Sequence, residues 1–379
     1  MEICDYNLCT GCAACMNGCQ HKAISMYSDR HGELHPVIDM DKCVECGLCI
    51  NRCPVNNHTE RFELRQCLAV WEESLSDRKY SASGGVAAAL YRTVISLCDG
   101  VGYGVGWGGD LKAHFIRVDE MSHLDALKGS KYVQAIVDNT YNQVKTDLQE
   151  KRKVLFIGTP CQVAGLRNYL HKEYDRLITC DLLCHGVPSQ DYLVEEIKSL
   201  IPHKYLQDIT NCRFRGNDKY NYWLTLWNGN TLLCGKKAVH SYYLTGFLTS
   251  ITLRESCYHC TYADRKRVGD ITIGDFGGLG RLDSYSGISL PKNISVVTLN
   301  SDRGVEFWNS MKASTSLLQE ERTIEEAIRG GGSFRNCATR NRKREKFLYD
   351  YERYGWKMAI RKSLWKSILK ARIQSLFKN

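Results

Sequence analysis

The amino-acid sequence predicts a small α+β domain at the N-terminus and a larger α/β domain after it. Two runs of four cysteines with one shared spacing fill residues 9–53, and short strand-like segments, 23–26 and 35–39, lie between the runs. Beyond residue 65, strand-like and helix-like segments alternate, which is the order of an α/β sheet. With 379 residues, 43% of them apolar and 25% charged, the chain has the length and composition of a folded protein of two or three domains.

The cysteine runs carry the first chemical prediction. They follow the C-x2-C-x2-C-x3-C spacing of bacterial ferredoxins, in which the fourth cysteine of each run ligates the other of two [4Fe–4S] clusters. We therefore expect one cluster on Cys9, Cys12, Cys15 and Cys53, and a second on Cys43, Cys46, Cys49 and Cys19. Zinc sites also use paired cysteines, but two copies of this pattern, one closed by Pro54, favour iron–sulfur clusters. This ferredoxin-like 2[4Fe–4S] domain is expected to span residues 1–58, and a charged linker to follow at 59–66.

A serine–glycine turn opens the next predicted helix. The segment 67–71 is expected to be a strand, and Ser83, Gly84 and Gly85 then lead into an apolar helix over residues 86–95. The first turn of a helix presents free backbone N–H groups, which suit a phosphate or the polar edge of a flavin. An ordinary N-cap by Ser83 explains the same residues, so both interpretations stay open.

Further strands are predicted at residues 101–107, 153–157 and 177–183, and a helix from Pro160 to about Leu170. Thr159 fits the N-cap of this helix and Pro160 its first position. Cys161 then lies in the first turn, where the helix dipole favours a thiolate.

Four cysteines outside the ferredoxin-like runs follow predicted strands or form a C-x2-C pair. They are Cys161, Cys184, Cys257 and Cys260. Thiols at the ends of neighbouring strands converge at one edge of a sheet. Spacing alone leaves three interpretations: a third [4Fe–4S] cluster, a structural zinc site, or unrelated thiols.

Several short motifs in the body resemble those of the coenzyme F420 hydrogenase/dehydrogenase beta-subunit family. They are Ser83–Gly85, Gly129-Ser-Lys-Tyr-Val-Gln134, Gly158-Thr-Pro-Cys-Gln162, Cys184-His185-Gly186, and Cys257-x2-Cys260 ahead of Gly269-Asp-Ile-x-Ile-Gly-Asp275. The resemblance covers roughly residues 65–310, and the ferredoxin-like domain in front matches the layout of the family's fused members.

The resemblance implies an α/β domain at residues 65–330, in parts 65–145 and 150–330, that binds FAD and its own [4Fe–4S] cluster. It favours Cys161, Cys184, Cys257 and Cys260 as ligands of that third cluster. It also implies flavin contacts from six residues in two loops: Ser83, Gly84, Gly85, Ser130, Lys131 and Gln134. His185, next to a predicted ligand, is the candidate catalytic residue, as a hydrogen-bond partner of the cluster or a proton donor to the flavin; a structural histidine is the alternative.

These expectations describe an iron–sulfur flavoprotein oxidoreductase. A flavin exchanges electrons in pairs or singly, so it connects an organic substrate to one-electron clusters. The expected partners are a small-molecule substrate and a low-potential carrier, such as ferredoxin or a reduced deazaflavin. The alternative function is a non-catalytic electron-transfer subunit of a larger complex, and a third is a membrane-surface adaptor.

The C-terminal residues 331–379 form a basic tail. Residues 335–379 hold 14 Lys/Arg against 3 Asp/Glu, so the net charge of +9 comes from this segment. Leu364, Trp365, Ile368, Leu369, Leu376 and Phe377 recur at helical spacing. We expect an amphipathic helix that packs on the body or on a partner, or lies on an anionic membrane. No nucleic-acid motif accompanies the charge. No secretory signal or membrane-spanning stretch is seen, so a cytoplasmic protein is expected.

Overall fold

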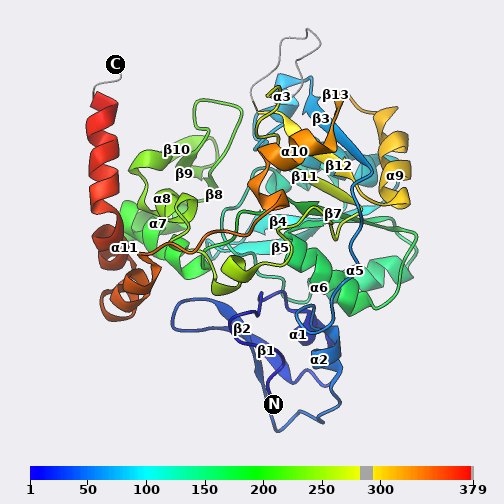
Figure 1. Cartoon of the computed structure of the whole chain (residues 1–379), viewed down its shortest axis with the longest axis horizontal. Coiled ribbons are helices and arrows are strands. Elements are labelled where there is room, and N and C mark those ends of the chain that lie inside the picture. Colours follow the sequence, from blue (N-terminus) through cyan, green and yellow to red (C-terminus); the bar gives the residue numbers. More distant parts are fainter. Residues whose placement is uncertain (282–292, 377–379) are drawn as a thin grey trace.

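The computed structural model describes residues 1–281 and 293–376 of the chain. The N-terminal residues form a small α+β unit at the bottom of Figure 1. Strands β1 (Ile24–Ser28) and β2 (Leu34–Ile38) pair antiparallel, and α1 (Ala14–Gly18) and α2 (Leu48–Arg52) are short helices. Each helix follows a residue in the left-handed conformation, Ala13 at φ 59° and Gly47 at φ 73°. Such a residue turns the chain sharply, which lets closely spaced cysteines surround one point.

A mixed sheet of eight strands forms the centre of the larger part, in the order β13-β3-β12-β11-β7-β6-β4-β5. The strands β4, β6, β7 and β11 run parallel, and β12 is antiparallel to both β11 and β3, so β3 points the same way as β11. The carboxyl ends of β3, β11, β7, β6 and β4 therefore meet at one edge. The strands are β3 (Gln66–Glu72), β4 (Val101–Trp107), β5 (Ala113–Val118), β6 (Val154–Gly158), β7 (Leu177–Leu182), β11 (Ile271–Asp275), β12 (Ser295–Leu299) and β13 (Leu317–Arg322).

Helices cover both faces of this sheet because its central strands are apolar on both sides. In β6, Val154 and Phe156 pack with α5 (Thr140–Gln149) and α6 (Pro160–Leu170). Leu155 and Ile157 face the other way, toward α4 (Val86–Arg92) and α9 (Asp302–Lys312).

A second lobe lies beside the sheet, at the left of Figure 1. It contains a three-stranded antiparallel sheet and three helices. They are β8 (Asn211–Arg213), β9 (Trp223–Asn228), β10 (Thr231–Lys237), α7 (Gln190–Leu200), α8 (Tyr242–Leu248) and α11 (Arg344–Leu376). The remaining elements are α3 (Leu75–Arg78), α10 (Ile324–Gly330), a π turn at Thr93–Leu97, and 3-10 turns at Met121–Leu127, His203–Asp208, Ala238–His240, Glu255–His259 and Gly332–Phe334.

The structure confirms the strands predicted at 67–71, 101–107, 153–157 and 177–183 within one residue or two. The helix predicted over 86–95 differs, because its α-helical part ends at Arg92 and continues as a π turn to Leu97. The segment expected to be a charged linker is docked on the body: Phe62 pairs with Arg267, and the buried Thr59 donates a hydrogen bond to Asn168.

The C-terminal helix α11 packs on the second lobe. Gly355 breaks its helical geometry, and the following residue, Trp356, is 1% exposed and stacks on Tyr192 of α7. Only part of the predicted apolar stripe is buried. Leu364 and Ile368 are buried, whereas Trp365 and Leu369 are half-exposed. The side chain of Leu376 and all of Phe377 lie outside the described residues. Packing thus buries one side of the stripe, and a membrane is not needed to do so.

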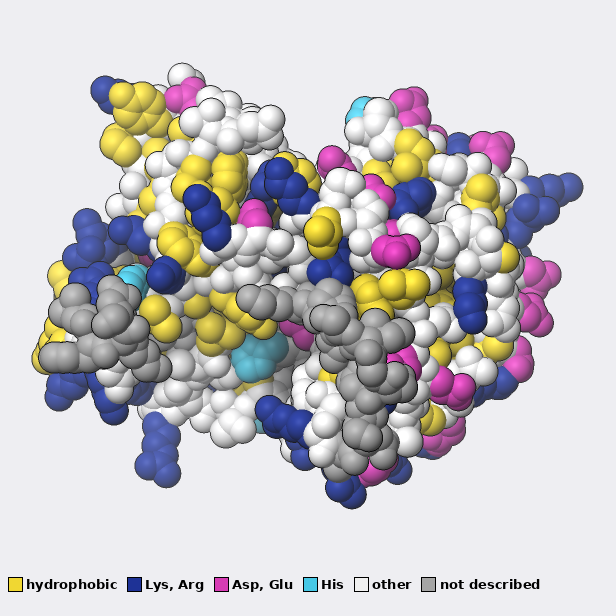
Figure 2. Space-filling view, turned by 90° about the horizontal axis from the view of Figure 1, so that it is seen from above, with side chains coloured by type: hydrophobic (Ala, Val, Ile, Leu, Met, Phe, Trp, Pro, Cys, Tyr) yellow, Lys and Arg dark blue, Asp and Glu magenta, His cyan; other side chains and the backbone are white. Residues whose placement is uncertain are grey.

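Charge is unevenly distributed over the surface. Figure 2 shows Lys and Arg side chains gathered around the C-terminal end of α11, while acidic side chains lie mainly at the opposite end of the same face. None of the helices in the described residues has the length and apolar character to span a bilayer.

Replacing Trp356 by alanine should destabilise the protein by about 3–5 kcal/mol, the usual cost of deleting a buried tryptophan. The variant also loses the hydrogen bond of 2.8 Å that the indole Nε1 donates to Glu196. Trp365→Ala is the matched control in the same helix, since its indole is 49% exposed, and should cost less than about 1 kcal/mol. Chemical denaturation of both variants measures the difference, and equal costs would contradict the packing of α11.

Candidate functional site

The first ferredoxin-like cysteines surround one cavity. It is lined by the thiols expected to hold one cluster, Cys9, Cys12, Cys15 and Cys53, together with Cys4. Burial raises the pKa of Cys12 to about 12, so an unliganded thiol at this place stays protonated. Iron replaces such protons when it binds, and four buried thiols around one cavity are the donor set that a [4Fe–4S] cluster requires.

A second cavity collects the other expected set. Cys19, Cys43, Cys46 and Cys49 line it, so each run sends its fourth cysteine to the cavity of the other run. Cys49 is buried, whereas Cys46 is exposed to solvent. The second cavity is therefore the one nearer the surface.

The four remaining candidate cysteines lie around the carboxyl ends of β6 and β7. Cys161 follows β6, Cys184 follows β7, and Cys257 and Cys260 come from the turn at 255–259 and its end. Desolvation raises the pKa of Cys184 to about 12, and the neighbouring Cys161 and Cys260 add to the shift. Desolvation likewise raises the pKa of Cys257, and the neighbouring Cys184 raises it further. The structure thus brings these four thiols together, and they supply the same donor set as each ferredoxin-like site.

The expectation of a stabilised thiolate at Cys161 is wrong for the protein without metal. The helix α6 begins as predicted, with Pro160 at its first position and the backbone N–H of Thr159 donating to Gln162 Oε1 at 3.0 Å. Desolvation nevertheless raises the pKa of Cys161 to about 11, although the hydrogen bond with Thr159 lowers it. Burial therefore outweighs the helix dipole at this position.

One further cysteine lies at this group. Cys337 raises the pKa of Cys260, although by less than desolvation does, and its thiol donates to the carbonyl of Tyr258 at 3.0 Å. No spacing pattern in the sequence points to Cys337, because it stands 77 residues after Cys260.

The first ferredoxin-like site and the third cysteine group lie next to each other. Gly165 stands one helical turn after Cys161, so the two share a face of α6. A Cβ added to Gly165 would lie 3.0 Å from the Cβ and 3.1 Å from the Sγ of Cys12. The absence of a side chain at Gly165 allows this close approach.

A wider seam joins the two parts of the molecule around this contact. We define it by residues 9–12 and 34–35 on the ferredoxin-like side and by Gln134, Gly165 and Arg254 on the other. Gln134 was expected at a flavin, but its Nε2 donates to the carbonyl of Thr10 at 3.2 Å and its Oε1 accepts from Arg254 at 3.1 Å. The structure places this residue in the seam.

The serine–glycine turn lies at the carboxyl end of β3, packed against β12. The Ser83 hydroxyl donates to the carbonyl of Ile294 at 3.0 Å, and the Gly84 N–H donates to Ser295 Oγ at 2.9 Å. A Cβ at Gly84 would come within 2.2 Å of the carbonyl oxygen of Val70. Gly85 is the N-cap residue of α4, at φ 92°. The side chain of Ser83 and the backbone N–H of Gly84 therefore hold the turn against β12.

The loop at residues 129–131 lies beside this turn. A Cβ at Gly129 would be 3.4 Å from the carbonyl oxygen of Tyr80. Ser130 and Lys131 are half-buried there. The Lys131 ammonium donates to the carbonyls of Ala126 and Lys128, and desolvation lowers its pKa to about 7. The backbone of this loop thus lies near the segment that leads into the Ser83 turn, whereas the Lys131 ammonium points back to the preceding turn and Gln134 lies in the seam.

Two residues that the sequence did not predict contact the same turn. Arg215 donates to Asp275 Oδ2 at 2.6 Å, to the carbonyl of Ala82 at 2.8 Å and to the hydroxyl of Tyr132 at 3.1 Å. Asn217 donates to the carbonyls of Ser81 and Ser83. Asp275 closes one of the motifs noted in the sequence, and its position at the end of β11 is the signal that a site lies there.

His185 lies between the third cysteine group and an aromatic pair. Its ring meets Phe247 edge-on at 5.2 Å, and Phe247 stacks on Tyr132 at 4.7 Å. Its Nε2 lies 3.3 Å from the carbonyl oxygen of Phe247, so the proton on Nε2 donates there. Desolvation lowers the pKa of His185, and the hydrogen bond to the Phe247 carbonyl opposes this shift.

Comparison with known proteins places these features in a family. Residues 151–324 match the model of the C-terminal part of the beta chain of coenzyme F420 hydrogenase/dehydrogenase, and residues 8–57 match that of the 4Fe-4S dicluster domain. No curated protein matches the sequence.

Among solved structures, a chain of the F420-reducing [NiFe] hydrogenase complex from Methanosarcina barkeri is 13% identical. The alignment covers 79% of this chain and 91% of that one, with a TM-score of 0.48. The two family models together identify an iron–sulfur protein: a 4Fe-4S dicluster domain, followed by a region similar to the C-terminal part of the beta subunit of coenzyme F420 hydrogenase/dehydrogenase.

Proposed function

We propose that this chain is an iron–sulfur flavoprotein oxidoreductase, which passes electrons between a low-potential carrier and an organic substrate through FAD and three [4Fe–4S] clusters. One observation carries the proposal. The group of Cys161, Cys184, Cys257 and Cys260 lies between the dicluster domain and the polar site at the carboxyl ends of β3 and β11. A redox centre in that position connects the two.

On the dicluster side, the connection is the contact between Gly165 and Cys12. It places the third cysteine group beside the first ferredoxin-like site, ahead of the second. Cys46 of the second site is exposed. We infer the order third group, first site, second site, with an external redox partner such as ferredoxin docking near Cys46.

On the other side, aromatic rings fill the space. Tyr132 accepts a hydrogen bond from Arg215 and stacks on Phe247, which contacts His185 next to Cys184. Rings in this position exclude water between the polar site and the cysteines. His185 orients this region through its hydrogen bond to Phe247.

The polar site has the groups that a flavin nucleotide requires. When bound, FAD exchanges electron pairs with a substrate and single electrons with a cluster. Arg215 is fixed by Asp275 and supplies permanent positive charge. Lys131 supplies an amine that changes protonation near neutral pH, and the start of α4 supplies free backbone N–H groups for a phosphate.

The second candidate is a non-catalytic electron-transfer subunit, with the substrate site on another polypeptide. It is favoured by the pairing of the polar groups with one another, since Arg215 already has Asp275 and the Ser83 hydroxyl already has Ile294. Flavin content separates the two candidates.

Changing Cys257 to serine should remove about a third of the iron and sulfide from anaerobically purified protein, because the third cluster loses a ligand. Metal analysis and the absorbance near 400 nm measure the loss. Cys337→Ser is the matched control, since this cysteine neighbours Cys260 but is not a proposed ligand. Unchanged iron in Cys257→Ser, or an equal loss in both variants, would contradict the proposed third cluster.

The purified wild-type protein should release about one flavin per chain on denaturation, and Arg215→Gln should release several-fold less. The reason is that Arg215 ties the Ser83 turn to β11 through Ala82 and Asp275. Arg117→Gln is the control, because Arg117 pairs with Asp147 at another part of the sheet. Wild-type protein with full iron but no flavin, even after incubation with FAD, would leave only the electron-transfer subunit.

Lys131 should react with an acylating reagent as an amine of pKa about 7, because desolvation lowers its pKa. Its labelling, followed by mass spectrometry in flavin-free protein, should therefore be half-maximal near pH 7. Lys266 is the internal control: its pKa is raised by its hydrogen bond with Glu63, so it labels only in strongly alkaline solution. Added FAD should protect Lys131. Labelling of Lys131 that follows the profile of Lys266 would contradict the proposed environment.

A further inference from the structure

Three arginines of the described residues are at most 2% exposed: Arg254, Arg267 and Arg344. A buried guanidinium is costly unless an opposite charge lies close to it. Arg267 has Asp181 at 2.9 Å. Arg344 has Glu33 at 3.1 Å and Glu255 at 3.3 Å.

Arg254 differs from the other two. It donates to the carbonyl of Cys9 at 2.9 Å, to the carbonyl of Leu34 at 2.8 Å and to Gln134 Oε1 at 3.1 Å. Its Nη2 also lies 3.4 Å from His35 Nε2. These partners are uncharged groups, and within residues 1–281 and 293–376 no carboxylate forms an ion pair with Arg254. The guanidinium therefore makes its hydrogen bonds, but no carboxylate of the described residues balances its positive charge.

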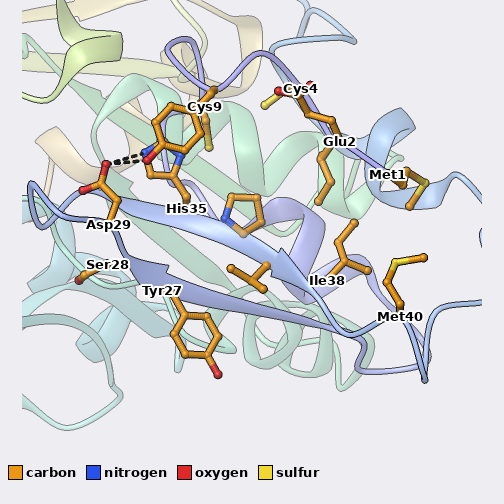
Figure 3. A pocket seen from close by; sticks show the side chains of 14 residues that line it. Met1, Glu2, Cys4, Cys9, Tyr27, Ser28, Asp29, His35, Ile38 and Met40 are labelled. Carbon is orange, nitrogen blue, oxygen red and sulfur yellow. Dashed lines mark hydrogen bonds and ion pairs between the residues drawn. The ribbon is translucent and has the colours of Figure 1, made fainter.

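Two carboxylates of this region, Glu33 and Asp29, are engaged by other groups. Glu33 binds Arg344 and accepts from the backbone N–H of Glu255. Asp29 accepts from the Tyr6 hydroxyl at 2.6 Å, and its ion-pair contact with His35 is 3.8 Å long. Figure 3 shows Asp29 turned toward the His35 side, with Cys9 beyond it. A different negative charge must balance Arg254.

The position of Arg254 identifies that charge. The residue stands three positions before Cys257 in the chain, and its guanidinium lies on the carbonyl of Cys9. On the other side, the backbone N–H of Cys257 donates to the carbonyl of Arg254 at 3.0 Å. A Cβ added to Gly11, next to Cys12, would lie 3.2 Å from Arg254 Nη1.

We propose that the counter-charge of Arg254 is the pair of iron–sulfur clusters that flank it, and that this residue sets their reduction potentials. Four thiolates give a [4Fe–4S] cluster net negative charge, and reduction adds one electron without a proton. A fixed cation beside the cluster stabilises the reduced state more than the oxidised one, which raises the potential. Arg254 thereby favours an electron on either of the two adjacent clusters over the exposed second site.

The half of this inference that concerns the third cluster rests on the proposed function. The half that concerns the Cys9 site rests on the dicluster domain alone. Iron content tells the two apart before any potential is measured. A protein with two clusters would remove the proposed third cluster and leave the effect of Arg254 on the Cys9 site to be tested.

The test is an anaerobic redox titration of the full chain, followed by electron paramagnetic resonance, for wild type and Arg254→Gln. Glutamine keeps a hydrogen-bond donor and removes the charge. We expect the reduction equilibria of the Cys9 cluster and the third cluster to become at least tenfold less favourable, which is about 59 mV for one electron. The cluster on Cys19, Cys43, Cys46 and Cys49 should keep its potential. A Cys257→Ser background, which lacks the third cluster, assigns the signals.

Two further variants separate charge from structure. Arg344→Gln loosens the same region but removes an arginine that carboxylates already balance, so the potentials should stay at wild-type values. Arg254→Lys keeps the charge, and its potentials should lie close to wild type even if Arg254→Gln fails to assemble. Unchanged potentials in Arg254→Gln, an equal shift of all clusters, or the full shift in Arg254→Lys would overturn the proposal.

Discussion

The close approach of helix α6 to the dicluster domain is the contact on which the rest of the structure depends. Cys161 in the first turn and Gly165 one turn later lie on the same face, so one helix supplies both a candidate ligand and the surface that meets Cys12. Any side chain at Gly165 would hold the two sites apart by its own volume. Because rigid secondary structure fixes both positions, the separation of Cys161 from Cys12 does not depend on a flexible linker.

The mixed sheet then arranges the remaining parts in a line along its carboxyl edge. Strand order places the end of β11, with Asp275, next to the end of β7, with Cys184, and β6 leads into Cys161. The Ser83 turn follows β3 on the far side of β12. A polar site and a cysteine group are thus neighbours along one edge, although Ser83 and Asp275 of the polar site stand 192 positions apart in the chain. Parallel strands make this arrangement natural, because each of their carboxyl ends opens into a loop at the same edge.

Local spacing explains which parts of this site the sequence could predict. The crossed cysteine sets follow from a short repeated spacing, and the turn before α6 from the identities of Thr159 and Pro160. Gln134 shows the limit of prediction from a short motif, because one motif alone grouped it with Lys131 as an expected flavin contact. Three residues of extended chain can span about 10 Å, enough to carry Gln134 from the loop at residues 129–131 into the seam. Arg215 and Arg254 had no local signal at all, since their partners Ala82 and Cys9 lie 133 and 245 positions away.

Electrostatics accounts for the part of the seam that packing does not explain. Arg344 and Arg267 form ordinary buried ion pairs, and such pairs contribute geometry more than net stability. Arg254 has the same burial and a full set of hydrogen bonds, yet only neutral acceptors receive them. Desolvation raises the pKa of Cys12, and iron that binds at the first ferredoxin-like site replaces the thiol protons, so a cluster there makes this side of the seam negatively charged. A lone buried cation is unfavourable beside neutral thiols and favourable beside thiolate-bound iron. Assembly of the clusters and docking of the dicluster domain should therefore stabilise each other through the same residue.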